Sequence, residues 1–389
     1  MGGKEKCGDV KGRIPEVDGL RGIAIASVLA WHYLIMPAVA KPGTALSYSL
    51  VFGRLAWSGV DLFFVLSGFL IGGILIDARY ATNYFRVFYT RRLFRIVPIY
   101  ATILLIFPAI LFAAQWAHCG DFSWLTSGLA PAYCYWTFTQ NIWMALTNSL
   151  GANALGITWS LAIEEQFYLT LPLVIRFRSS HGRLILVLAG ICFAPIIRTA
   201  IHLFWPHNQL AGFLLMPCRA DALLLGVLAA MLLRNAVWRE RIQRSNWFFA
   251  ISFPILLAGI AFLNVKSPSP VLPLMQAVGH TWLALFYTCV LLFSVTRHRT
   301  LVGRTLRLKW LGWLGAIAYG TYLIHQFVQG MLFGFVWGRE PRITGGKSLL
   351  TTVLALLLTI VVARLSWIYF ERPILLLGHK SSYNTKSPR

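Results

Sequence analysis

The chain has 389 residues, of which 57% are hydrophobic and only 12% are charged. Soluble domains carry about 25% charged residues, so this composition excludes an ordinary soluble protein and predicts an all-α integral membrane protein. The formal net charge is +22. Its basic residues lie in short loops between apolar segments and form no basic domain, so the pattern argues against a nucleic-acid partner.

Ten apolar segments come close to the roughly 20 residues that a bilayer requires. They lie at about 18–38, 54–76, 97–115, 158–176, 184–204, 211–233, 247–264, 273–296, 311–337 and 348–370. With the N-terminus inside, 25 of the 35 Lys and Arg residues fall in cytosolic segments and 6 in outer ones. This bias predicts a multi-pass protein with both termini cytoplasmic.

We expect a single membrane domain within 1–389, spanning about 18–373, with no appended soluble domain. A short polar cytoplasmic tail is expected at 374–389. The six cysteines show no metal-binding spacing, so no metal is predicted.

The first segment carries Arg21 near its start and His32 near its end. Eleven residues are about three helical turns, so both side chains are expected on one helix face. Ionisable residues inside a membrane helix are costly, and they indicate a functional site by default.

The longest outer loop, about 116–157, has no Lys or Arg and is rich in aromatic residues. It fits an interfacial aromatic belt, or else a lid or carbohydrate platform over the outer mouth. Cys119 and Cys134 would face an oxidising compartment, which leaves a disulfide between them open.

Polar residues of five predicted spans fall in one layer, roughly 9–15 Å below the outer surface. They are His32, Asp61, Glu164, Glu165, Arg198, Arg219 and Asp221. Either they line a wet cavity or they form ion pairs that only hold the bundle together. The unperturbed pKa of histidine suits His32 as a general base. The residues alone do not decide which glutamate, if either, orients its ring.

Arg91 and Arg95 lie one helical turn apart where the third span leaves the membrane on the inside. Paired guanidinium groups suit phosphate, although the topology rule already predicts basic residues there. The pattern fits a transmembrane group-transfer enzyme with a cytosolic donor. It also fits a proton-coupled transporter or an acyl-translocating partner without transferase activity, although we find no internal repeat.

Seven motifs in sequence order resemble the acyltransferase-3 family, bacterial membrane O-acyltransferases that modify surface glycans and some small metabolites. The motifs are Asp18-Gly19-Leu20-Arg21-Gly22 through His32; Val60-Asp61-Leu62-Phe63-Phe64-Val65-Leu66-Ser67-Gly68-Phe69; Arg91-Arg92-Leu93-Phe94-Arg95; Trp159-Ser160-Leu161 with Glu164-Glu165-Gln166-Phe167-Tyr168; Arg219-Ala220-Asp221; Tyr319, Tyr322, Leu323 and His325; and Phe370-Glu371-Arg372-Pro373.

The resemblance implies a bacterial inner-membrane enzyme that transfers an acyl group, most often acetyl, from cytosolic acyl-coenzyme A to a hydroxyl of a glycan or glycolipid. It implies that His32 is catalytic, with Glu164 or Glu165 assisting, and that Arg21, Arg91 and Arg95 bind the donor. Residues expected at the substrate site are Asp61, Ser67, Trp159, Ser160, Tyr168, Arg219, Asp221, Tyr322 and His325. Some members of the family carry an additional periplasmic esterase-like domain, and none is expected here. Transfer would therefore finish within the membrane domain, or a periplasmic or glycan-assembly partner would receive the acyl group.

Overall fold

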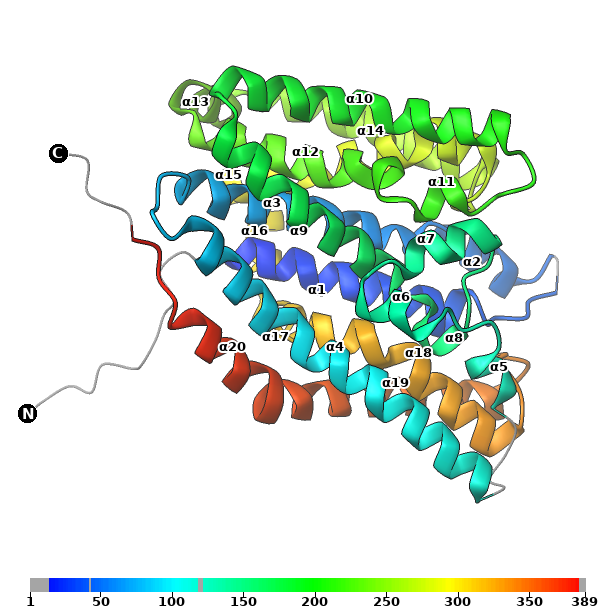
Figure 1. Cartoon of the computed structure of the whole chain (residues 1–389). Helices are drawn as coiled ribbons and strands as arrows, with labels where there is room; N and C mark the ends of the chain where they lie inside the picture. Colours follow the sequence, from blue (N-terminus) through cyan, green and yellow to red (C-terminus); the bar gives the residue numbers. More distant parts are fainter. Residues whose placement is uncertain (1–13, 42, 118–121, 385–389) are drawn as a thin grey trace, which may run out of the picture.

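The computed structural model describes residues 14–41, 43–117 and 122–384, and these residues form helices but no strands (Figure 1). The predicted all-α class is confirmed for this part of the chain. The long helices lie side by side as one bundle (Figure 1). The first described residues and the C-terminal helix lie at the same end of it, and Ile14 and His379 line a common cavity (Figure 1).

Seven helical stretches of the described residues are long and apolar enough to cross a membrane, so the predicted count of ten is not reached by this measure. They are Ala45–Asp77, Tyr84–Trp116, Ser180–Phe204, Ala211–Arg234, Asn246–Lys266, Met275–Thr296 and Gly346–His379. Each overlaps one predicted span. The other three predicted spans are also helical. The first carries Asp18 and Arg21, the fourth carries Glu164, Glu165 and Arg176, and the ninth is interrupted at Ile317.

The first predicted span changes helix type part-way. α1 (Pro15–Leu29) begins with proline at its first turn, where the missing N–H costs nothing, and it continues as the π-helix η1 (Ala30–Ile35). π-helical turns inside α-helices often occur at functional sites. Because His32 lies in η1, a constant 100° per residue does not carry the face of Arg21 up to His32.

The centre of the bundle is α3 (Gly59–Asp77) packed against α12 (Met216–Arg234). Glycines allow the two backbones to touch: a Cβ at Gly68 would overlap the carbonyl oxygen of Leu223, and one at Gly226 would overlap that of Val65. Such small-residue contacts are typical of membrane helix pairs. Around this pair lie α2 (Ala45–Gly53), η2 (Ala56–Ser58), α9 (Trp159–Phe177), α10 (Ser180–Phe204), α11 (Ala211–Leu214), α13 (Ala236–Arg244), α14 (Asn246–Lys266), η3 (Met275–Gly279) and α15 (His280–Thr296).

Four short helices cover the end of the bundle opposite α13 and the C-terminal helix α20 (Arg372–His379) (Figure 1). They are α5 (Ser123–Thr126), α6 (Ala132–Trp136), α7 (Gln140–Thr147) and α8 (Asn153–Gly156). Gln166 of α9 donates to Phe138 O at 2.9 Å and Asn141 Oδ1 at 2.8 Å, which attaches this cap to the bundle. Cys134 is buried in α6, whereas Cys119 lies outside the described residues.

The remaining helices enclose α1 on its other side. They are α4 (Tyr84–Trp116), α16 (Leu301–Leu306), α17 (Lys309–Ala316), α18 (Ala318–Trp337), α19 (Gly346–Ser366), the π-helix η4 (Trp367–Glu371) and α20 (Arg372–His379). The predicted polar tail thus begins with a helix that packs against α4, because Ile374, Leu375, Leu376 and Leu377 continue the apolar pattern. After it, Asn83 Nδ2 donates to Ser382 O at 2.8 Å.

Candidate active site

A cavity of about 1180 Å³ lies among α1, α3, α4, α9, α18 and the C-terminal helices. The expected site residues that line it are Arg21, Ser67, Arg91, Arg95, Ser160, Glu164, Tyr168 and Tyr322. The expected residues absent from its lining are His32, Asp61, Trp159, Glu165, Arg219, Asp221 and His325. The helices therefore bring the two arginine motifs together but do not place every motif residue in one cavity.

Six arginines line the cavity, and four of them belong to the two motifs that the sequence predicts for the donor site. We call these four the arginine cluster: Arg21, Arg91, Arg92 and Arg95. Arg91 donates to Ser381 O from Nε at 2.9 Å and from Nη2 at 2.6 Å. Arg92 lies 5.8 Å from the ring centre of Tyr168, and its buried Nε has no hydrogen-bond partner among the described residues. The prediction named Arg91 and Arg95 but not Arg92, although Arg92 belongs to the same basic motif.

Arg21 and Arg95 make no hydrogen bond or ion pair with any other described residue. Arg95 does interact electrostatically with Arg21, which is unfavourable, and with Glu164, which is favourable. A cavity wall with unpaired guanidinium groups suits anions, because the groups retain their donors and their charge.

Glu164 and Tyr168 form the carboxylate side of the cavity. Tyr168 OH lies 3.0 Å from Glu164 Oε2 and 2.5 Å from Ser67 Oγ. Glu165 points away from the cavity, and its buried Oε1 has no hydrogen-bond partner among the described residues. The two neighbouring glutamates thus lie in different surroundings, as their 100° separation on a helix predicts.

His32 is paired with another histidine. Its Nδ1 lies 3.1 Å from Nε2 of His325 and 3.1 Å from the carbonyl oxygen of Val28. His325 is fully buried, and its Nδ1 lies 2.6 Å from the carbonyl oxygen of Tyr322. Neither Glu164 nor Glu165 makes a hydrogen bond to His32, so the structure gives the adjacent position to a histidine rather than to a carboxylate.

Tyr322 separates the cavity from this histidine pair. Its hydroxyl lies 2.7 Å from Ser160 Oγ and 3.0 Å from Ile157 O, and Phe63 packs edge-on against its ring. The ring centres of Tyr322 and His325 are 5.8 Å apart. A molecule that extends from the arginine cluster toward His32 would therefore pass Tyr322.

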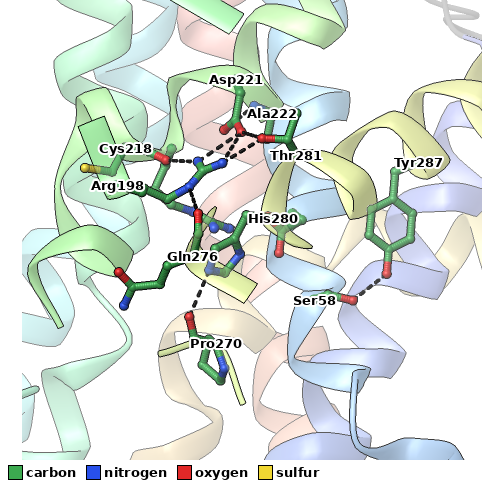
Figure 2. A network of polar contacts seen from close by, with 12 residues as sticks. Ser58, Arg198, Cys218, Asp221, Ala222, Pro270, Gln276, His280, Thr281 and Tyr287 are labelled. Atoms are coloured by element: carbon green, nitrogen blue, oxygen red, sulfur yellow. Dashed lines mark hydrogen bonds and ion pairs between the residues drawn. The ribbon is translucent and has the colours of Figure 1, made fainter. Parts of the chain in front are cut away.

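Two of the remaining charged residues of the predicted layer, Arg198 and Asp221, belong to a buried network of polar contacts (Figure 2) and do not line the cavity. Arg198 of α10 donates from Nη2 to Asp221 Oδ2 at 3.0 Å and to Thr281 Oγ1 at 2.6 Å, and it also donates to the carbonyls of Cys218 and Gln276. These partners come from α12, η3 and α15, so one guanidinium joins three segments of the bundle.

Arg219 of α12 forms an ion pair with Asp61 of α3, and both side chains are 1% exposed. Nε and Nη1 of Arg219 and Oδ2 of Asp61 have no partner among the described residues. Trp159 is also buried, packed against Phe213 with ring centres 4.4 Å apart. The structure does not place this whole layer in the lining of one cavity. Arg198 and Asp221 form one buried ion pair and Arg219 and Asp61 another, as the ion-pair alternative expects.

The C-terminal segment closes one side of the cavity. Tyr383 places its ring 5.3 Å from the Arg91 guanidinium, and burial raises the pKa of Tyr383 although Arg91 and Arg92 act to lower it. Glu371 and Tyr319 also line the cavity and were not named as site residues. Both belong to motifs that resemble those of the family, so the sequence contained the information needed to name them as site residues.

The chain belongs to a family of membrane acyltransferases, since the family model described as an acyltransferase domain matches residues 14–368. The predicted resemblance is thereby confirmed. None of the solved structures matches the chain.

Several curated proteins are similar to the chain over most of its length. O-acetyltransferase OatA of Staphylococcus aureus (strain NCTC 8325) is 26% identical over 95% of the chain and 58% of its own length. Peptidoglycan O-acetyltransferase OatA of Listeria monocytogenes is 24% identical over 93% of the chain and 56% of its own length. YrhL of Bacillus subtilis (strain 168) is 27% identical over 95% of the chain and 56% of its own length. The chain thus spans little more than half the length of these relatives.

Proposed function

We propose that this protein is a membrane O-acyltransferase that moves an acetyl group from acyl-coenzyme A to a hydroxyl of a glycan. The observation that carries this proposal is the cavity with unpaired Arg21 and Arg95 at one end and the His32–His325 pair beyond Tyr322. Membership of an acyltransferase family supports the reaction class. It gives no support to a transporter without transferase activity.

The arginine cluster suits the donor substrate, because coenzyme A carries several phosphate groups. Arg95 and Arg21 have free donors for phosphate, and Arg91 would exchange the neutral carbonyl of Ser381 for a charged oxygen. We propose that this end of the bundle faces the cytosol of a bacterial inner-membrane protein, which the distribution of basic residues supports. No metal is needed for this chemistry.

His32 acts at the other end of the path. In the proposed reaction its Nε2 takes the proton from the acceptor hydroxyl, whose oxygen attacks the thioester carbonyl. The carbon–sulfur bond breaks, an ester carbon–oxygen bond forms, and the coenzyme A thiolate leaves. Glu164 and Tyr168 flank the route of the acyl group, with Ser67 and Ser160 beside them.

The acceptor class follows from the names of the relatives. Those proteins are named for O-acetylation, and the names of the Listeria and Bacillus relatives also include peptidoglycan. We propose that the acceptor here is likewise a cell-surface glycan or its lipid-linked precursor, presented at the end of the bundle covered by α5 to α8.

The reaction is tested by thiol release from acetyl-coenzyme A, with purified protein and a mixed glycan pool. Release that depends on the pool, with a product about 42 Da heavier because acetyl replaces hydrogen, supports the proposal. Donor binding without release, together with substrate movement across vesicles, would replace it with the transport alternative.

We expect Arg95→Gln to weaken donor binding about ten- to hundredfold, because a hydrogen bond between charged groups contributes about 1.5–3 kcal/mol. The measurement is the Kd of acetyl-coenzyme A by titration calorimetry. The matched control is Arg86→Gln, which removes an exposed charge from the same helix outside the cavity. Equal affinities for wild type and Arg95→Gln would remove Arg95 from the donor site.

A further inference from the structure

Two neighbouring carbonyl groups determine where the protons of the histidine pair lie. A carbonyl oxygen accepts hydrogen bonds and cannot donate them, whereas a neutral imidazole has one donor and one acceptor nitrogen. His325 Nδ1 lies 2.6 Å from Tyr322 O, so it carries the proton and leaves Nε2 as an acceptor. His32 Nδ1 lies 3.1 Å from that acceptor and 3.1 Å from Val28 O, so it must also be the protonated nitrogen.

The same contacts leave one nitrogen free on His32. With the proton on Nδ1, the lone pair is on Nε2, and no described residue is hydrogen-bonded to that atom. His32 is half-buried, whereas its partner is fully buried. Nε2 of His32 is therefore the one nitrogen of the pair that is both basic and without a partner within the described structure.

The position of His325 is itself held by its surroundings. Tyr33, next to His32 in η1, donates from its hydroxyl to the backbone carbonyl of His325 at 2.7 Å, and the same hydroxyl lies 2.7 Å from Thr359 Oγ1. The contacts join η1, α18 and α19. The π-helical turn at 30–35 thus places two consecutive residues against α18. His32 contacts it through its ring, and Tyr33 contacts it through its hydroxyl.

We propose that His325 is a positioning residue that holds His32 in the Nδ1–H tautomer and accepts its hydrogen bond when His32 becomes an imidazolium. This inference rests on the proposed function, because it assigns a role in the same transfer reaction. A neutral imidazole would serve here where many catalytic histidines use a carboxylate. The sequence analysis had placed His325 at the substrate site instead.

Two amide variants separate this role from simple packing. His325→Asn places its amide near the original Nδ1, so it keeps a donor for Tyr322 O but removes the acceptor for His32. His325→Gln places its amide near Nε2, so it keeps the acceptor and removes the donor to Tyr322.

We expect His325→Asn to lower kcat about ten- to hundredfold with an unchanged KM for acetyl-coenzyme A, because it loses one hydrogen bond to a charged group. We expect His325→Gln to keep most of the wild-type kcat. Equal losses, or a larger loss for Gln, would overturn the positioning role.

The tautomer is tested without any activity measurement. In ¹⁵N-histidine spectra of the wild-type protein, with the His32 signals assigned by their loss in His32→Gln, we expect Nε2 to show the shift of an unprotonated nitrogen. We expect His325→Asn to increase the population of the Nε2–H tautomer, because Val28 O is then the one remaining acceptor among the described residues that holds the proton on Nδ1. A protonated Nε2 in the wild type would overturn the inference. An inactive wild type would instead overturn the proposed function, and the spectrum would still decide the tautomer.

Discussion

We expect His32→Ala to lower kcat for acetyl transfer about 10²- to 10⁴-fold, the usual contribution of a general base. The binding of acetyl-coenzyme A should be unchanged, because His32 does not line the cavity that contains the arginine cluster. The substitution removes the Nε2 acceptor and leaves His325 without its ring partner. The measurement is the rate of labelled acetyl transfer at saturating donor, beside the Kd of the donor.

The matched control is His181→Ala, which removes an exposed histidine at the start of α10. It should transfer acetyl at the wild-type rate. Transfer by His32→Ala within a few-fold of this control, in protein of equal yield and thermal stability, would show that another group takes the proton.

We expect Arg219→Met to lower the free energy of unfolding by about 3–5 kcal/mol, because it leaves a buried carboxylate without its partner. Asp61 is 1% exposed, and its Oδ2 already has no partner among the described residues. Methionine replaces the arginine stem with an unbranched apolar chain, so the substitution removes the charge and keeps part of the side-chain packing. The measurement is the unfolding midpoint in detergent micelles, by heat or by denaturing detergent.

The double variant Asp61→Asn with Arg219→Met distinguishes a structural pair from a substrate contact. Removing both charges should recover most of the lost stability, since no unpaired ion remains in the interior. Acetyl transfer should recover with it. A stable double variant that no longer transfers acetyl would return these residues to the substrate site.

The bundle was largely predictable because apolar length and basic loops follow directly from bilayer thickness and topology. The number of spans was harder to predict. The segment with Arg21 and the segment with Glu164 and Glu165 carry charges of the site, so they are less apolar than a membrane helix usually is. The proximity of Arg91 and Arg95 was also predictable, because they are one helical turn apart and local helix geometry alone places them together.

The pairings across the bundle could not be predicted, because they join residues far apart in the sequence. His32 and His325 are 293 positions apart, and Asp61 and Arg219 are 158 apart. A depth estimate places such side chains in one layer but does not say which helix neighbours which. The π-helix at 30–35 was a second obstacle, since its turn changes the face of His32 without a signal in the apolar pattern.

The central claim is that the acyl group passes from the arginine cluster to an acceptor near His32 at the opposite end of the bundle. Sealed vesicles sorted by an accessible C-terminal tag test it directly, because acetyl-coenzyme A does not cross membranes. With the C-terminus outside, external labelled acetyl-coenzyme A should acetylate glycan enclosed in the vesicles. Label that appears only on external glycan, or only in vesicles of the opposite orientation, would contradict the account.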